Sequence, residues 1–215
     1  MSCDMPSGKS LLVDVDAMCK LAHWRMLELL PAITGVDPPA CSTLASTKFR
    51  ALKSLVMPDG KVFRCVDAAK SVVSAVETFG AMPQPDPALL PLFQNIAGID
   101  AGEAVMLARL IEDPNTLFLT GDKRALRAVA AMDDKIRATI AERVVPVECI
   151  IKCVLDAFGI DELRARVCTW KDVDKAVAIV MGSRCDQAEA SVREGLASYL
   201  GELHALCRPS LIRAC

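Results

Sequence analysis

The acidic residues best suited to chemistry stand at or beside the ends of hydrophobic segments. Asp14 ends the run LLVD, Asp122 follows LFLTG, and Asp100 and Glu103 lie in the phrase GIDAGEA. Carboxylates collected from distant parts of a chain repel one another, so a fold that gathers them usually does so around a divalent cation. We therefore predict metal-dependent chemistry at these four residues.

The elements around these residues predict a sheet that brings them to one edge. Residues 10–15 and 116–120 are short apolar runs that suit buried parallel strands. Ligand sites gather at the carboxyl ends of such strands, which places Asp14 and Asp122 together if the two strands are neighbours. The D-x-x-E phrase stands at the start of a predicted helix. Taken alone, that pair favours a capping box, which satisfies free backbone N–H groups.

Strands and helices alternate along the chain, which predicts an α/β fold with a mostly parallel central sheet flanked by helices. Apolar periodicity predicts helices over 17–30, 43–56, 66–79, 102–112, 123–131 and 133–143. KVFRC (61–65) and VVPVE (144–148) are expected short strands, and a last helix of this part ends at Gly159. We expect one domain over residues 1–159 and a helical C-terminal extension over 160–215.

The extension carries an apolar seam at alternating spacings of four and three residues, formed by Val192, Leu196, Tyr199, Leu203 and Leu206. The seam is too short for a coiled coil, which needs about three or more heptads. Packing on its own domain is the favoured interpretation. A homodimer or partner interface is the minority interpretation.

Net charge and composition limit the kinds of partner that can be expected. The net charge of −2 gives no global basic field for nucleic acid, although a local basic cluster is present, formed by Lys48, Arg50, Lys53, Lys61 and Arg64. That cluster suits either a nucleic-acid track or a solvated helix face. No apolar run is long enough to span a membrane, and no secretory signal is visible, so a cytoplasmic protein without membrane contact is expected.

The cysteines also favour a cytoplasmic protein. The ten cysteines form no C-x-x-C pair, and the two histidines are far apart, which disfavours a structural zinc site. Without a secretory signal, such cysteines are expected to be reduced cytosolic thiols, most of them small core residues.

The order of the motifs resembles the PIN-domain family of metal-dependent ribonucleases. LLVD, an apolar and basic helix, D-x-G-E-A and a strand ending in T-G-D-K follow one another as in that family, over roughly residues 10–158. Two short phrases match the family's pattern residue by residue, Gly102-Glu103-Ala104 and Thr120-Gly121-Asp122. The helical tail lies outside the resemblance.

The resemblance implies hydrolysis of RNA phosphodiester bonds with Mg²⁺ or Mn²⁺. Such an ion binds a phosphate oxygen, lowers the pKa of the attacking water and stabilises the leaving oxygen. The implied metal ligands are Asp14, Asp100 and Asp122, and Glu103 would join them or act on the water. Candidate contacts to substrate are Thr120, Lys123 and Lys48.

One position departs from the family. Its members usually carry a further Glu early in the second helical segment, where this chain has Ser46, Thr47 and Lys48. Asp16 and Glu28 are candidate substitutes, but neither stands where the pattern expects it. A site short of one acid would bind metal less tightly, act differently or be inert.

Two other functions stay open. Asp14-x-Asp16 after an apolar strand also resembles the haloacid-dehalogenase phosphohydrolases, with Asp14 as nucleophile and Asp16 as acid–base, but that scheme gives no role to the D-x-x-E phrase. Alternatively, a PIN-like scaffold binds RNA or a protein without cleaving. Many small PIN proteins are toxins neutralised by an antitoxin, which would imply a protein inhibitor and a homodimer. This chain is longer than that pattern.

Overall fold

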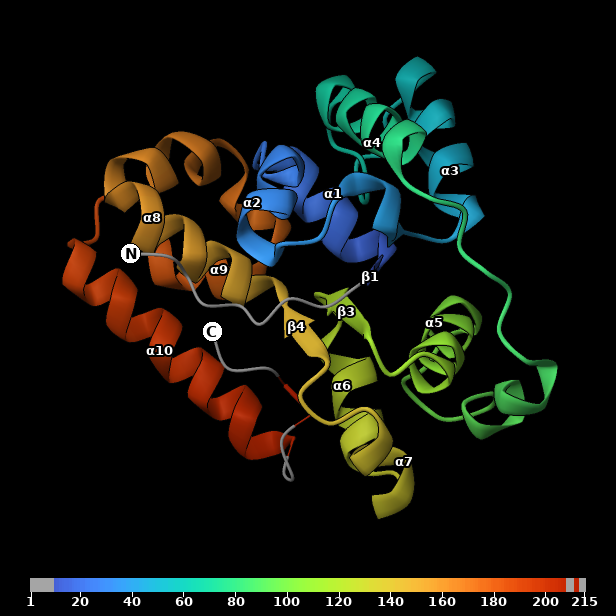
Figure 1. Ribbon diagram of the computed structural model, residues 1–215. Helices are drawn as coiled ribbons and strands as arrows, with labels where there is room; N and C mark the ends of the chain where they lie inside the picture. Colours follow the sequence, from blue (N-terminus) through green and yellow to red (C-terminus); the bar gives the residue numbers. More distant parts are fainter. Residues whose placement is uncertain (1–9, 208–210, 213–215) are drawn as a thin grey trace.

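A four-stranded parallel sheet lies at the centre of the computed structural model, which describes residues 10–207 and 211–212 (Figure 1). The strand order is β2-β1-β3-β4. The strands are β1 (Ser10–Val13), β2 (Cys41–Ser42), β3 (Thr116–Thr120) and β4 (Val144–Pro146). The expected α/β fold with a parallel sheet is thereby confirmed.

Helices cover both faces of this sheet because side chains alternate along each strand. Leu11 and Val13 face a core shared with α1, α4 and α8, whereas Leu12 and Phe118 face a second core shared with α5 and α6. The helices are α1 (Val15–His23), α2 (Leu30–Thr34), α3 (Ala45–Val56), α4 (Val66–Thr78), α5 (Ala101–Glu112), α6 (Lys123–Ala130), α7 (Asp134–Thr139), α8 (Val147–Val167), α9 (Lys175–Met181) and α10 (Glu189–Leu206). Short 3-10 turns are η1 (Leu27–Leu29), η2 (Pro38–Ala40), η3 (Pro87–Leu92) and η4 (Cys168–Val173).

Three local predictions need correction. The strand expected over 61–65 is a turn, because one carboxylate oxygen of Asp59 accepts hydrogen bonds from the backbone N–H groups of Lys61, Val62 and Phe63. The helix expected over 17–30 ends at His23. The chain turns two residues later, at Arg25, which has a positive φ of 53°. The helix expected over 133–143 is only the six residues of α7. The two-residue strand β2 was not predicted.

The C-terminal helices share the core of the sheet. Gly159, with φ 80° and ψ 178°, breaks α8 as predicted, but the helix resumes and runs to Val167. Val177 and Met181 of α9 and Val192 and Leu196 of α10 join the same cluster as Leu11 and Val13, whereas Tyr199 and Leu203 pack in the cluster of Leu12 and Phe118. The seam of α10 therefore packs on its own chain, as favoured from the sequence, although Leu206 at its end stays 40% exposed. A continuous core crosses the boundary expected at residue 159.

The prediction of reduced cysteines is wrong for four of the described residues, because Cys149, Cys153, Cys168 and Cys185 are disulfide-bonded. Cys168 and Cys185 form a disulfide across a separation of 17 residues, with Cα atoms 5.9 Å apart, because η4 and the loop after α9 lie side by side. Cys19, Cys41 and Cys207 are free and buried, as expected for small core residues. Within residues 10–207, no helix has the length and apolar character that crossing a membrane requires.

Replacing both Cys168 and Cys185 with alanine is expected to lower the free energy of unfolding by about 3 kcal/mol, because a cross-link over a loop of this size restricts the unfolded chain. Chemical denaturation without reductant measures the change. Cys65→Ala is the control, since this half-buried cysteine is free. Two additional reactive thiols in the native, non-reduced wild type would show that the bond does not form.

Candidate functional site

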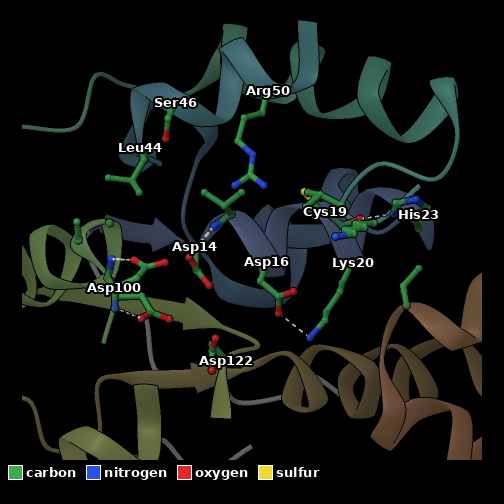
Figure 2. Close-up of a pocket in the computed structure, with 17 residues that line it drawn as sticks. Asp14, Asp16, Cys19, Lys20, His23, Leu44, Ser46, Arg50, Asp100 and Asp122 are labelled. Carbon is green, nitrogen blue, oxygen red and sulfur yellow. Dashed lines mark hydrogen bonds and ion pairs between the residues drawn. The ribbon is translucent and has the colours of Figure 1, made fainter. Parts of the chain in front are cut away.

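An open cavity of about 480 Å³ lies at the carboxyl ends of β1 and β3 (Figure 2). Five acidic side chains line it: Asp14, Asp16, Asp100, Glu103 and Asp122. They come from the start of α1, the start of α5 and the turn after β3. The structure thus brings the four acids predicted from separate phrases to one cavity and adds Asp16.

Asp14 is fixed by the pairing of the two central strands. Its backbone N–H donates to the Leu119 carbonyl at 2.9 Å, which continues the ladder of β1 and β3. One carboxylate oxygen caps α1 by accepting from the Val15 N–H at 2.7 Å, and the other accepts from the Thr120 hydroxyl at 3.3 Å. The side chain is therefore held at the base of the cavity and is only 6% exposed.

Asp100 and Glu103 form the predicted capping box. The Glu103 N–H donates to the Asp100 carboxylate at 2.8 Å, and the Asp100 N–H donates to the Glu103 carboxylate at 2.7 Å. A Cβ on Gly102 would lie 2.7 Å from a methyl carbon of Leu44, so a larger residue there would displace the Leu44 side chain. The same two acids line the cavity, so capping and a place in the site are compatible.

Asp122 caps the next helix and pairs with a cation. Its carboxylate accepts from the backbone N–H groups of Arg124 and Ala125 and forms a 2.7 Å ion pair with the Arg124 guanidinium. Burial works to raise the pKa of Asp122, but the hydrogen bonds from Arg124 outweigh it and hold that pKa below its usual range. Asp122 therefore stays ionised.

Two other acids carry raised pKa values. Burial, and then the charge of Asp16, raises the pKa of Asp14 to about 6. Burial raises the pKa of Glu103 to about 7, with further contributions from the charges of Asp100, Asp122 and Asp14. Burial is the largest cause of both shifts, and the neighbouring carboxylates add a repulsion that a bound cation would relieve.

The cavity offers the type of ligand atom that a hard divalent cation prefers, but these atoms are not yet grouped around one point. Carboxylate oxygens are the ligands that Mg²⁺ and Mn²⁺ prefer. Among residues 10–207, however, no three His, Cys, Asp or Glu side chains are already grouped to hold an ion. Asp100 and Glu103 are engaged with each other's backbone, and Asp122 is engaged with Arg124. Loading an ion therefore requires the side chains of these acids to move closer together.

The three residues predicted to contact substrate do not face the cavity. The Lys123 ammonium lies 2.6 Å from the Glu148 carboxylate and over the ring of Tyr199. Lys48 lies 4.0 Å from Glu77. Thr120 is fully buried and orients Asp14. The side chains of Lys123 and Lys48 thus have other partners than a substrate in this cavity.

Other residues reach the cavity instead. Arg50 and Lys61, two members of the basic cluster, line it, and Figure 2 shows Arg50 extending from α3 toward the acids. Ser46 also lines it, and it is one of the three residues, with Thr47 and Lys48, that stand where the family pattern expects a Glu. Of the two candidate substitutes, Asp16 lines the cavity, whereas Glu28 lies elsewhere and pairs with Arg166 at 3.2 Å.

Sequence reasoning missed Lys20, which also lines the cavity. Its ammonium lies 2.6 Å from the Asp16 carboxylate. The signal was present in the sequence, because an acid four residues before a lysine on one helix is a typical ion pair. Its burial could not be read from the sequence, since the neighbours that cover it come from distant segments.

No protein-family model matches this chain, and neither the curated proteins nor the solved structures contain a significant match to it.

Thr120→Val is expected to raise the pKa of Asp14 further above about 6, because the hydroxyl that donates to its ionised form is lost. An NMR titration of the Asp14 carboxyl carbon measures the shift. Thr116→Val is the matched control on the same strand, since that hydroxyl contacts Ser10 instead. An unchanged Asp14 pKa in Thr120→Val would contradict the described contact.

Asp14 is also expected to make stability depend on pH. Its pKa rises from about 4 in the unfolded chain to about 6 in the folded one, so the folded state binds more protons between those values. The free energy of unfolding should therefore fall as pH rises through that window, by on the order of 2 kcal/mol for this residue.

Asp14→Asn should remove this loss, so that the variant gains stability relative to wild type between pH 4.5 and pH 7.5 in chemical denaturation. Asp133→Asn is the control, because Asp133 is an exposed helix cap outside the cavity. Parallel pH profiles of wild type and Asp14→Asn would show that the pKa of Asp14 is not raised.

Proposed function

We propose that this chain is a divalent-metal-dependent, PIN-like endoribonuclease that hydrolyses RNA phosphodiester bonds. One observation carries the proposal: four acids predicted from separate phrases of the sequence line one cavity at the carboxyl edge of a parallel sheet. That edge is where ligand sites of such sheets gather. The raised pKa values of Asp14 and Glu103 add support, because perturbed acids concentrate at functional sites.

In this proposal Asp14, Asp100 and Asp122 hold Mg²⁺ or Mn²⁺. When bound, the ion would supply a Lewis acid for the phosphate and a water of lowered pKa. Thr120 keeps Asp14 oriented toward the cavity through its hydroxyl. Glu103, with a pKa of about 7, is matched to accepting a proton from water near neutral pH.

The basic residues of the cavity suit the charge of the substrate. Arg50 and Lys61 line the same cavity as the acids, although the chain as a whole is slightly acidic. Cations placed beside a metal-binding group neutralise the remaining phosphate charge and position the backbone without reading bases. RNA is therefore the proposed partner, held mainly through its phosphates.

Further partners rest on the family resemblance alone. These are a protein inhibitor of the antitoxin type and a second copy of the chain. The cytoplasmic location also stays a proposal, and the Cys168–Cys185 disulfide weakens the argument for it from reduced thiols, because structural disulfides are rare in the cytosol.

The decisive assay is cleavage of labelled single-stranded RNA with Mn²⁺ or Mg²⁺. Asp14→Asn and Asp122→Asn should each lower the rate by about 100-fold or more, as expected when a group that stabilises developing charge is lost. Asp133→Asn is the matched control for Asp122→Asn, because both aspartates cap helices and asparagine preserves a cap. Chelation with EDTA should abolish the activity of the wild type.

Three results would point elsewhere. Equal cleavage by wild type and both site variants would identify a contaminating nuclease. Metal-dependent hydrolysis of a small phosphate monoester, lost only in Asp14→Asn, would favour the haloacid-dehalogenase-like alternative. RNA binding without cleavage at any metal concentration would favour the non-catalytic PIN-like module, consistent with the lack of the expected Glu among Ser46, Thr47 and Lys48.

A further inference from the structure

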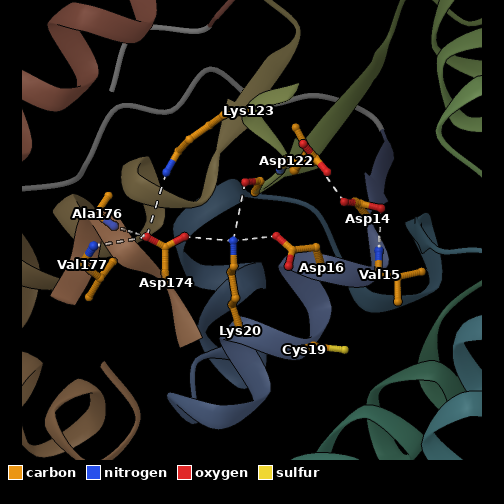
Figure 3. A network of polar contacts seen from close by, with 12 residues as sticks. Asp14, Val15, Asp16, Cys19, Lys20, Asp122, Lys123, Asp174, Ala176 and Val177 are labelled. Carbon is orange, nitrogen blue, oxygen red and sulfur yellow. Dashed lines mark hydrogen bonds and ion pairs between the residues drawn. The ribbon is translucent and has the colours of Figure 1, made fainter. Parts of the chain in front are cut away.

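A buried ionic network joins the cavity to the C-terminal helices (Figure 3). The Lys20 ammonium lies 2.6 Å from Asp16, 2.8 Å from Asp174 and 3.5 Å from the Gly121 carbonyl oxygen. The side chains of Lys20 and Asp174 are only 11% and 4% exposed, whereas that of Asp16 is 46% exposed toward the cavity. One cation therefore connects α1, the turn after β3 and the residue that begins α9.

Asp174 is a rigid anchor for that cation. One of its oxygens caps α9 by accepting from the Ala176 N–H at 2.8 Å and the Val177 N–H at 3.1 Å. The other oxygen faces Lys20. Burial works to raise the pKa of Asp174, but the nearby charges of Lys20 and Lys123 outweigh it, so the carboxylate stays ionised. One oxygen thus caps α9 and the other pairs with Lys20.

The network supports the turn that carries Asp122. A Cβ on Gly121 would lie 2.5 Å from the Asp16 carboxylate and 2.8 Å from the Lys20 ammonium, so the backbone of the turn rests directly on that ion pair. On the other side of Asp122, Lys123 reaches Glu148 at 2.6 Å and Asp174 at 3.9 Å. Gly121, before Asp122, is therefore linked to Asp174 through Lys20, and Lys123, after Asp122, lies near Asp174 itself.

We propose that Asp174 is a positioning residue of the site: by holding Lys20, it fixes Asp16 and the turn that presents Asp122 to the cavity. The proposal rests on the proposed nuclease function, and it adds a residue outside the stretch that resembles the family. Buried ion pairs add little net stability compared with apolar packing, because desolvation offsets their attraction, and in some proteins their role is to select one geometry. A role in geometry therefore suits this network better than a role in stability.

Asp174→Asn is the sharpest test, because asparagine keeps an oxygen to cap α9 and loses the charge that holds Lys20. Asp172→Asn is the matched control, since Asp172 is exposed and only two residues away. In the metal-free protein, hydrogen exchange at the Asp122 amide, which donates to the Thr120 hydroxyl, should speed up at least tenfold in Asp174→Asn and stay unchanged in Asp172→Asn. With RNA and Mn²⁺, kcat should fall at least tenfold while KM changes little.

Lys20→Met tests whether Asp174 acts on the Asp122 turn through Lys20. If Asp174 acts through Lys20, the double variant Lys20→Met with Asp174→Asn should show no faster Asp122 exchange and no lower kcat than Lys20→Met alone. Additive losses would overturn that route. A lower melting temperature of Asp174→Asn with unchanged Asp122 exchange and unchanged kcat would overturn the positioning role. If wild type neither binds Mn²⁺ nor cleaves RNA, the nuclease proposal fails, while the metal-free exchange result still decides whether Asp174 holds the turn.

Discussion

The parallel pairing of β1 with β3 is the constraint on which the site depends. Val13 lies opposite Leu119, so the next residue of each strand, Asp14 and Thr120, meets its partner where the ladder ends. Side chains alternate between the two faces of a strand, and a register shift of one residue would turn Asp14 away from Thr120. The packed apolar residues on both faces, Leu11 and Leu12 among them, hold this register.

The acidic residues near Asp14 differ in whether a cation neutralises their charge. Asp122 and Asp174 are stabilised as anions by cations in direct contact, whereas Asp14 and Glu103 are left with raised pKa values. Cations such as Arg50 and Lys20 line the same cavity as these carboxylates. In the proposed function, the carboxylates would attract a mobile cation and the fixed cations would help orient a phosphate.

Much of this arrangement follows from local sequence, and the rest does not. Short apolar runs predicted β1 and β3, and the D-x-x-E phrase predicted the capping box, because both signals depend on neighbouring residues. The turn at Asp59, the Cys168–Cys185 disulfide and the burial of Lys20 were missed or misjudged, because each depends on backbone geometry or on contacts between distant segments. Lys123 looked like a substrate contact from its motif, and only the fold reveals Glu148 and Tyr199 beside it.

The shared core has a practical consequence for anyone shortening this protein. A fragment trimmed after Gly159 would retain every phrase that suggests a nuclease, yet it would strip apolar cover such as Leu163 and Leu196 from the sheet. It would also leave the ammonium of Lys20 with one carboxylate instead of two. Such a fragment could aggregate or be inactive even with its acidic site residues intact. An inactive fragment would therefore say nothing about the activity of the full chain.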